Sequence, residues 1–353
     1  MCRFSYLVVG DLILTAAVTS TLLGGCVTGP KGRPARQFGE SIVFVGEEPA
    51  ELSHKPENGQ PFSVRSTYQQ ELGTTNYIEG RDYVVDYSRG ALRRTQDSRL
   101  PDFRKNLLFG QEDFDHGKFP GFGNGGFFAF VDYTFRQTES WPVQAKQTKF
   151  LGATKKKLCL GQEVRIVAFG DSISAGGDAS KPEFIFWRRW ADELQRNYPK
   201  AYVTAVNGAT GGDSTVQGLQ RLESKLLQEN PDLVLIGFGM NDHNVGGVAI
   251  PQFEKNLHEM IARIRHSTHA EIVLFSAFPP NPKWKFGTHR MEDYAATTAR
   301  VARESACAYA DVFHNWQSLA ERKKPEDLLG NNINHPNDFG HWIYFQVLSE
   351  MGL

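Results

Sequence analysis

The chain has 353 residues, enough for one large domain or two smaller ones with a sizeable core. Its 39 Lys and Arg residues nearly balance its 40 Asp and Glu residues, so the formal net charge is -1. A chain with this balance lacks the electrostatic attraction to phosphate backbones that a basic excess provides. Nucleic-acid binding is therefore disfavoured.

Residues 1–26 have the pattern of an export signal. The apolar stretch from Leu7 to Leu23 is shorter than the about 20 residues of a spanning helix, and it carries Asp11. The small residues before Cys26 resemble a bacterial lipobox, which implies lipidation of Cys26. We therefore expect a lipid-anchored protein of the bacterial cell envelope, at the outer membrane or cell surface or facing the periplasm. The alternative is an ordinary secretory signal with a chance cysteine and a secreted protein.

Export would leave two cysteines in the folded part, Cys159 and Cys307. They can pair with each other or remain separate small apolar side chains, and the sequence leaves both alternatives open. The chain has no cysteine and histidine cluster with the spacing of a zinc site. We expect neither a metal nor a cofactor.

The next part of the chain is predicted to be a tether followed by an all-β domain. Residues 27–40 contain Gly, Pro and basic residues without apolar periodicity, which is typical of a flexible tether. Residues 41–150 contain short alternating or aromatic runs separated by turn residues, which predicts strands in a sandwich or jelly-roll-like accessory domain. Its aromatic residues favour a core role, with a carbohydrate-stacking face as the alternative.

Residues 160–353 alternate between predicted strands and amphipathic helices, which indicates a parallel sheet covered on both faces. The expected strands are Val164–Phe169, Tyr202–Val206, Leu233–Phe238, Glu271–Ala277 and Tyr309–Val312. A last helix is expected from about Phe339 to Met351. The fold class is therefore α/β with three layers.

Four polar stretches follow these strands or precede the last helix. They are Gly170-Asp171-Ser172-Ile173-Ser174, residues 207–214, residues 237–242 and residues 332–341. Ligand sites in open parallel sheets gather at the carboxyl ends of the strands. We therefore expect these stretches to form one site.

The residue types in these stretches suit ester hydrolysis, which needs a nucleophile, a base and donors for the oxyanion. Ser172 is the candidate nucleophile and His335 the candidate general base. The candidate oxyanion donors are the backbone N–H groups of Ser172 and Gly212 and the side-chain amide of Asn241.

These four blocks resemble the SGNH, or GDSL-type, hydrolase family, over roughly residues 160–353. The resemblance places Ser172 at the family's nucleophile position, Gly212 and Asn241 at its oxyanion positions and His335 at its histidine position. It implies a flavodoxin-like three-layer α/β/α fold and esterase activity. Four blocks in the right order are specific, whereas any one of them alone is weak.

The chain departs from the family pattern at one position. The family has an aspartate three residues before the histidine, where this chain has Asn332. Our hypothesis is that Asn332 orients His335 through its side-chain oxygen without supplying charge. The alternatives are a main-chain carbonyl, an acid elsewhere in the chain, or a Ser-His dyad.

The remaining polar residues of the four blocks are interpreted as supports of the site. Asp171, Asp213 and Asp242 are expected to accept backbone N–H groups within their loops, close enough to the site to touch a ligand. His341 is expected to pack beside the site, and His243 and His314 are interpreted as structural histidines.

The substrate is inferred from context, because a nucleophile and an oxyanion hole do not define the acyl group or the alcohol. The order of an exported β domain ahead of an SGNH domain is similar to that of certain two-domain carbohydrate esterases. Our first hypothesis is the removal of O-acetyl groups from a carbohydrate or polysaccharide. The alternatives are a lipase, lysophospholipase or thioesterase of the same family, and a non-catalytic glycan-binding lipoprotein.

Overall fold

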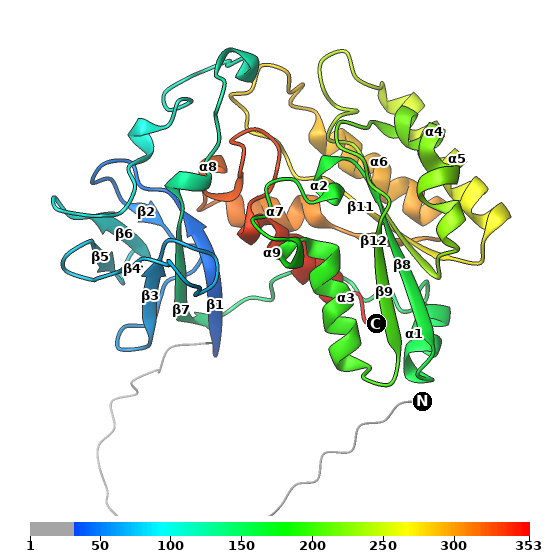
Figure 1. Cartoon of the computed structure of the whole chain (residues 1–353), viewed down its shortest axis with the longest axis horizontal. Helices are drawn as coiled ribbons and strands as arrows, with labels where there is room; N and C mark the ends of the chain where they lie inside the picture. The colour runs from blue at the N-terminus through cyan, green and yellow to red at the C-terminus, as the bar shows by residue number, and fades with distance from the viewer. Residues whose placement is uncertain (1–31) are drawn as a thin grey trace, which may run out of the picture.

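The structure is a computed structural model that describes residues 32–353, so Cys26 and the expected export signal lie outside the described residues. A β-rich part and an α/β part lie side by side (Figure 1). We call residues 32–150 the β domain and residues 151–353 the hydrolase domain.

The β domain is built from two antiparallel sheets. The first has the strand order β1-β7-β3-β4 and the second the order β2-β6-β5. Their strands are β1 (Arg33–Ile42), β2 (Ala50–Glu51), β3 (Phe62–Arg65), β4 (Asn76–Tyr77), β5 (Tyr83–Asp86), β6 (Ala91–Arg94) and β7 (Ala129–Gln137). Buried side chains of both sheets share one core, as the contacts of Val64, Leu92 and Tyr133 show. The prediction of an all-β domain is confirmed.

One detail of the sequence prediction for this part differs from the structure, and another agrees with it. The expected tether over residues 27–40 is wrong from Arg33 onwards, because β1 begins there and pairs with β7. Its register shifts between Gln37 and Glu40, and this irregularity hides the alternating pattern of the strand. The core interpretation of the aromatic residues holds for Tyr83 and Tyr133, which are buried.

The hydrolase domain alternates between strands and helices, and all five expected strands and the last helix are present within a few residues. The strands are β8 (Glu163–Gly170), β9 (Tyr202–Asn207), β10 (Leu233–Gly237), β11 (Glu271–Phe275) and β12 (Ala308–Ala310). The helices are α1 (Gly152–Cys159), α2 (Ser172–Ala175), α3 (Phe186–Asn197), α4 (Thr215–Lys225), α5 (Ile250–Ser267), α6 (Met291–Glu304), α7 (Val312–Ala320), α8 (Pro325–Leu328) and α9 (Asp338–Ser349).

The five strands form a parallel sheet in the order β12-β11-β10-β8-β9. In chain order this is the 2-1-3-4-5 arrangement of flavodoxin-like folds, whose ligand site lies where the strand order reverses. Here that point lies between β8 and β10. Helices α3 and α9 pack together on one face and α4, α5 and α6 on the other (Figure 1). The flavodoxin-like three-layer prediction is confirmed.

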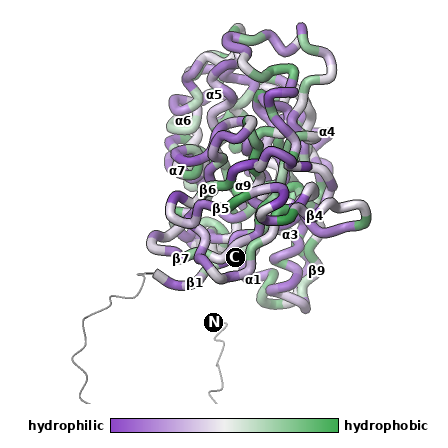
Figure 2. Tube along the Cα trace, turned by 90° about the vertical axis from the view of Figure 1, so that its left-hand side faces the viewer, coloured by the Kyte–Doolittle hydropathy of each residue, from purple (hydrophilic) through white to green (hydrophobic). Residues whose placement is uncertain are grey.

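The outer helices each bury one face. On α5, Phe253, Leu257, Ile261 and Ile264 are buried while the intervening residues are largely polar. Figure 2 shows the resulting mixture of hydrophilic and hydrophobic residues along α5 and α6. Within residues 32–353, no helix is both long and apolar enough to cross a membrane. Cys159 is exposed at the end of α1, whereas Cys307 is buried before β12.

The two domains share a buried polar interface. The Lys323 ammonium is completely buried, lies 3.0 Å from the Glu40 carboxylate and donates to the Ser41 carbonyl. Glu40 also accepts a hydrogen bond from the Tyr133 hydroxyl at 2.6 Å. Removing one partner of such a buried pair typically costs about 3–5 kcal/mol, because the other charge is left buried alone. The β domain is therefore fixed to the hydrolase domain.

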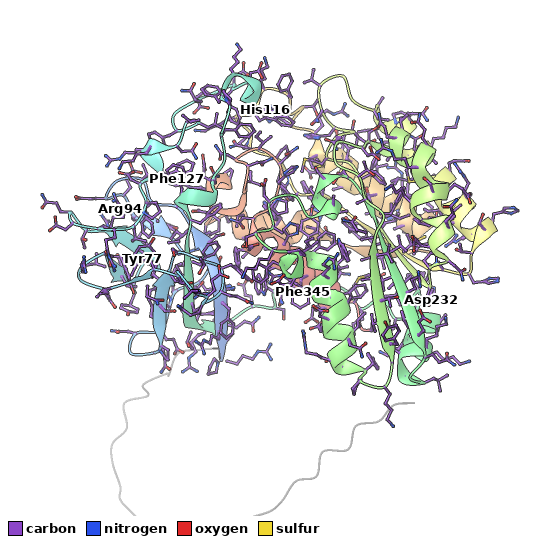
Figure 3. The ribbon with its side chains drawn as sticks, viewed as in Figure 1. Tyr77, Arg94, His116, Phe127, Asp232 and Phe345 are labelled. Atoms are coloured by element: carbon purple, nitrogen blue, oxygen red, sulfur yellow. The ribbon has the colours of Figure 1, made fainter. Side chains whose placement is uncertain are left out.

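A second interface joins the long connection between β6 and β7 to the connection between β11 and α6. Phe114 and Trp284 pair as an isolated bridge, and both belong to an apolar cluster with Ile333. The Trp284 indole donates to His116 at 3.0 Å. His116 is labelled at the top of Figure 3, where the two connections meet. Because Ile333 lies two residues before His335, this cluster supports the segment that carries the histidine.

Candidate active site

The four sequence blocks meet at the carboxyl edge of the parallel sheet. Ser172 follows β8 and begins the short helix α2, and Asn241 follows β10, the neighbouring strand. The Asp171 carboxylate accepts the backbone N–H of Ile173 at 2.9 Å and so caps α2. This cap fixes the turn that presents Ser172 at the point where the strand order reverses.

Ser172 and His335 are brought into direct contact. The Nε2 atom of His335 lies 2.8 Å from the Ser172 hydroxyl oxygen. Both residues are partly buried, with 26% of the His335 side chain exposed. The imidazole is therefore placed to accept the hydroxyl proton.

The other imidazole nitrogen pairs with an aspartate that the sequence analysis did not single out. The Asp178 carboxylate oxygen Oδ2 lies 3.0 Å from Nδ1 of His335. A carboxylate at this nitrogen assigns the imidazole proton to Nδ1 and leaves Nε2 free to accept from Ser172. Ser172, His335 and Asp178 thus have the geometry of a nucleophile, base and acid triad.

The local backbone explains how Asp178 reaches the imidazole. Asp178 has a φ of 58°, in the left-handed region that aspartate tolerates better than most residues. A Cβ on Gly177 would lie 2.9 Å from His335 Nδ1, and one on Gly330 would lie 2.3 Å from the Asp178 Cβ. Glycine at these two positions lets the backbone approach the acid and the imidazole closely.

The hypothesis that Asn332 orients His335 is wrong. Asn332 is buried, with a φ of 59°. Its side-chain oxygen accepts from the Asn124 amide at 3.3 Å and the Asn281 amide at 3.4 Å. Its carbonyl accepts from Asn281 at 2.9 Å. Asn332 therefore anchors the histidine segment to Asn124 and Asn281. Of the alternatives from the sequence, an acid elsewhere in the chain matches the structure, and that acid is Asp178.

The expected oxyanion donors lie on segments that touch each other. The Asn241 side-chain amide donates to the Asp213 carbonyl at 2.9 Å. A Cβ on Gly211 would lie 3.9 Å from the Ser172 Cβ, so the turn that contains Gly212 passes beside the nucleophile. Gly212 adopts a φ of 81°, which favours glycine. These contacts hold Gly212 and Asn241 on segments next to Ser172.

The supporting aspartates differ in their partners. Asp171 and Asp242 accept backbone N–H groups as expected, Asp242 from Thr215 at 2.9 Å. Asp213 instead pairs with Arg221 at 2.5 Å, so the expectation of a backbone-bracing role is wrong for its carboxylate. Burial raises the pKa of all three carboxyls, that of Asp171 to about 7.

The three other histidines named in the sequence analysis, His341, His243 and His314, have the roles expected for structural groups. His341 is buried, which lowers its pKa to about 3, and its Nε2 donates to the Gly177 carbonyl at 3.1 Å. This bond supports the turn that leads to Asp178. His243 is buried with its Nδ1 2.5 Å from the Met240 carbonyl, and His314 is exposed beside Asp311.

One group of described residues has the composition of a metal site, but it lies on other elements. Glu254, His258 and Glu304 have ligand atoms within 4.8 Å of one another on α5 and α6. Glu254 already pairs with Arg300 at 2.8 Å. The candidate active site is built from a hydroxyl, an imidazole, a carboxylate and amides, and this set performs acyl transfer without a metal.

The fold and this site define a serine hydrolase acting on esters. The GDSL-like lipase/acylhydrolase family matches residues 168–343. An arylesterase from Vibrio mimicus is 34% identical over 187 residues, which cover 53% of this chain and 88% of the relative. The chain therefore belongs to the GDSL-like lipase/acylhydrolase family.

Two further comparisons are with enzymes of stated activity. A thioesterase 1/protease 1/lysophospholipase L1 from Escherichia coli is 27% identical over 172 residues, 49% of this chain and 75% of the relative. The solved structure of a two-domain esterase active on acetylated mannans is 22% identical, with a TM-score of 0.49. The matched part is 59% of this chain and 53% of the two-domain esterase chain.

The contact between Asp178 and His335 predicts the effect of Asp178→Asn. We expect kcat for an aryl acetate to fall about 10²–10⁴-fold, because the amide does not stabilise the imidazolium and favours the wrong tautomer. Adding Asn332→Asp should not restore activity, because residue 332 faces Asn124 and Asn281. Steady-state kinetics of the single and double variants measure this. Recovery of kcat in the double variant would contradict this prediction, because it would show that an aspartate at position 332 can serve as the acid.

The raised pKa of Asp171 predicts a pH-dependent stability. Between its ordinary value of 3.8 and about 7, the folded protein holds a proton that the unfolded chain releases, so this carboxyl makes stability fall as pH rises through the window. Asp171→Asn keeps a capping oxygen and removes this titration. The melting temperature of the variant relative to the parent should therefore be higher at about pH 8 than at about pH 5. An equal difference at both pH values would contradict this account.

Proposed function

We propose that this ester hydrolase removes short acyl groups, acetyl first of all, from the hydroxyls of a carbohydrate. The observation that carries the catalytic part is the chain of contacts from Ser172 through His335 to Asp178, at 2.8 Å and 3.0 Å. The carbohydrate part is supported by the exposure of the site. The side chains of His335 and Asp178 are 26% and 37% exposed, so a bulky polymer can reach the serine at the surface.

The proposed reaction has two stages. In the first, Ser172 Oγ attacks the ester carbonyl while its proton moves to His335 Nε2, and Asp178 stabilises the resulting imidazolium. The oxyanion accepts hydrogen bonds from the N–H groups of Ser172 and Gly212 and from the Asn241 amide. The carbon–oxygen bond to the alcohol then breaks, and His335 returns its proton to the leaving oxygen. In the second stage, His335 takes a proton from water as the water attacks the acyl carbonyl; the bond from that carbon to Ser172 Oγ then breaks, and His335 returns the proton to Oγ as the acid leaves.

A second candidate substrate is a long-chain acyl ester or thioester. It is favoured by the relative whose name includes thioesterase and lysophospholipase. Long acyl chains need an apolar groove, so the dependence on chain length separates the two candidates.

The test is a panel of nitrophenyl esters from acetyl to octanoyl and of acetylated polysaccharides, run on the parent and on Ser172→Ala. We expect acetyl esters to be cleaved fastest, acetate to be released from at least one polysaccharide, and all turnover to fall about 10⁴-fold or more in the variant. Rates that rise steeply towards octanoyl would contradict the carbohydrate proposal. Turnover that is equally fast in parent and variant would contradict the role of Ser172, and a parent without turnover above background would favour a protein that only binds.

We also propose that a lipid on Cys26 anchors the protein to a membrane of the bacterial cell envelope. Support comes from the apolar stretch and the small residues before Cys26 in the sequence. In a bacterial host fed a labelled fatty acid, the parent should incorporate label and Cys26→Ser should not. Equal labelling of both, or of neither, would contradict the anchor.

A further inference from the structure

A pocket of about 350 Å³ lies between the two domains, beside the catalytic acid. One wall comes from the β domain, from the segment 66–71 after β3 and from residues 123–130 at the start of β7. The other wall comes from the hydrolase domain and includes Asp178, Ser180 and Gly330. Its volume is within the range of about 300–1,000 Å³ that is typical of small-molecule sites. Neither domain forms this pocket alone.

The direction of proton transfer in the triad indicates which half of the substrate lies on the side of this pocket. His335 gives its proton to the leaving alcohol, so the alcohol must extend from the imidazole side of Ser172, whereas the carbonyl oxygen points to the oxyanion donors. Asp178 contacts His335 through its carboxylate and also lines the pocket. Through Asp178 the pocket therefore adjoins the imidazole side of the site, on which the alcohol part of an ester leaves.

The walls of the pocket combine aromatic and polar groups. Tyr68, Phe128 and Phe184 contribute apolar surface, while Thr67, Gln69 and Ser180 contribute hydroxyl and amide groups. Sugar rings present both an apolar C–H face and a rim of hydroxyls, which such a mixture can match. The acidic residues Glu71, Asp178 and Asp338 also line the pocket, and a long acyl chain would gain nothing from burial against their carboxylates.

The pocket is held in shape by contacts across the domain boundary and within the hydrolase domain. Arg189 on α3 donates to the Tyr68 hydroxyl at 2.8 Å and to the Asp338 carbonyl at 3.3 Å. Asp338 in turn accepts the backbone N–H and the hydroxyl of Ser180, at 2.8 Å and 2.6 Å. Lys181 forms an ion pair with Glu71. These bonds fix the walls of the pocket, and fixed walls lower the cost of ordering a site on binding.

We propose that this interdomain pocket is the subsite for the sugar that carries or adjoins the acylated hydroxyl, so that the β domain selects the alcohol half of the substrate. This inference rests on the proposed carbohydrate esterase function. It makes the β domain a specificity determinant, in addition to its role in holding the histidine segment.

Two neighbouring glycines give a matched test. Gly125 lines the pocket and Gly126 does not. Both belong to the 3₁₀ turn Gly125–Phe127, and at both an added Cβ would meet nothing within 4 Å. Phe127, labelled in Figure 3, marks this turn at the domain boundary near α8. Gly125→Phe should fill the pocket, while Gly126→Phe makes the same chemical change outside it.

The measurements are kcat and KM for nitrophenyl acetate and for acetylated xylo- and manno-oligosaccharides. We expect Gly125→Phe to lower kcat/KM for the oligosaccharides about tenfold or more, mainly through KM, and to leave nitrophenyl acetate within about twofold. Gly126→Phe should leave both substrates within about twofold. As a second pair that does not add bulk, Gln69→Ala should raise KM for the oligosaccharides, whereas Gln70→Ala, outside the pocket, should not.

The outcomes separate the two proposals. Equal effects of Gly125→Phe and Gly126→Phe on the oligosaccharides, together with equal effects of Gln69→Ala and Gln70→Ala, would overturn the subsite while leaving the esterase function intact. So would equal losses on both substrate classes in Gly125→Phe. If the parent cleaves nitrophenyl acetate, but no oligosaccharide of the panel is cleaved or inhibits that reaction, then the carbohydrate function fails and the subsite fails with it.

Discussion

The segment that carries His335 is held by hydrogen bonds from the β domain as well as from its own domain. The Asn124 amide donates to the Leu329 carbonyl at 2.8 Å and to Asn332 at 3.3 Å. At the other end of the segment, the Asn337 amide donates to the Ser41 hydroxyl at 3.0 Å. These donors and acceptors are buried, so losing one leaves a partner unsatisfied at a cost of about 1–3 kcal/mol. The position of the general base therefore depends on residues that precede the hydrolase domain in the chain.

This arrangement accounts for the asparagine that stands where the family has an aspartate. A carboxylate at position 332 would face two amide groups in a buried site and would not reach the imidazole. The carboxylate that contacts the imidazole is instead that of Asp178, on the turn after α2. Asp178 is partly exposed, so its carboxylate contacts solvent as well as the histidine. Because the carboxylate at the imidazole belongs to Asp178, residue 332 can be an asparagine that anchors the histidine segment.

Much of the hydrolase domain followed from local patterns in the sequence. The apolar runs predicted β8 to β12, and the four polar blocks predicted the contact between Ser172 and His335. Asp178 was missed because motif spacing led to position 332, although the sequence Gly176-Gly177-Asp178 just after the nucleophile was a usable signal. The interdomain contacts of Asn124 and Asn337 join residues more than two hundred positions apart, and no local period encodes such pairs. The first strand, β1, was hidden for a different reason, because its register shift between Gln37 and Glu40 breaks the alternating pattern.

The central claim is that Asp178, and not residue 332, holds the Nδ1 proton of His335. Proton NMR tests it most directly, because a strongly hydrogen-bonded imidazole N–H gives a resolved downfield signal. We predict that the parent and Asn332→Ala show this signal and that Asp178→Asn loses it while remaining folded by circular dichroism. A signal that persists in Asp178→Asn and disappears in folded Asn332→Ala would contradict the account.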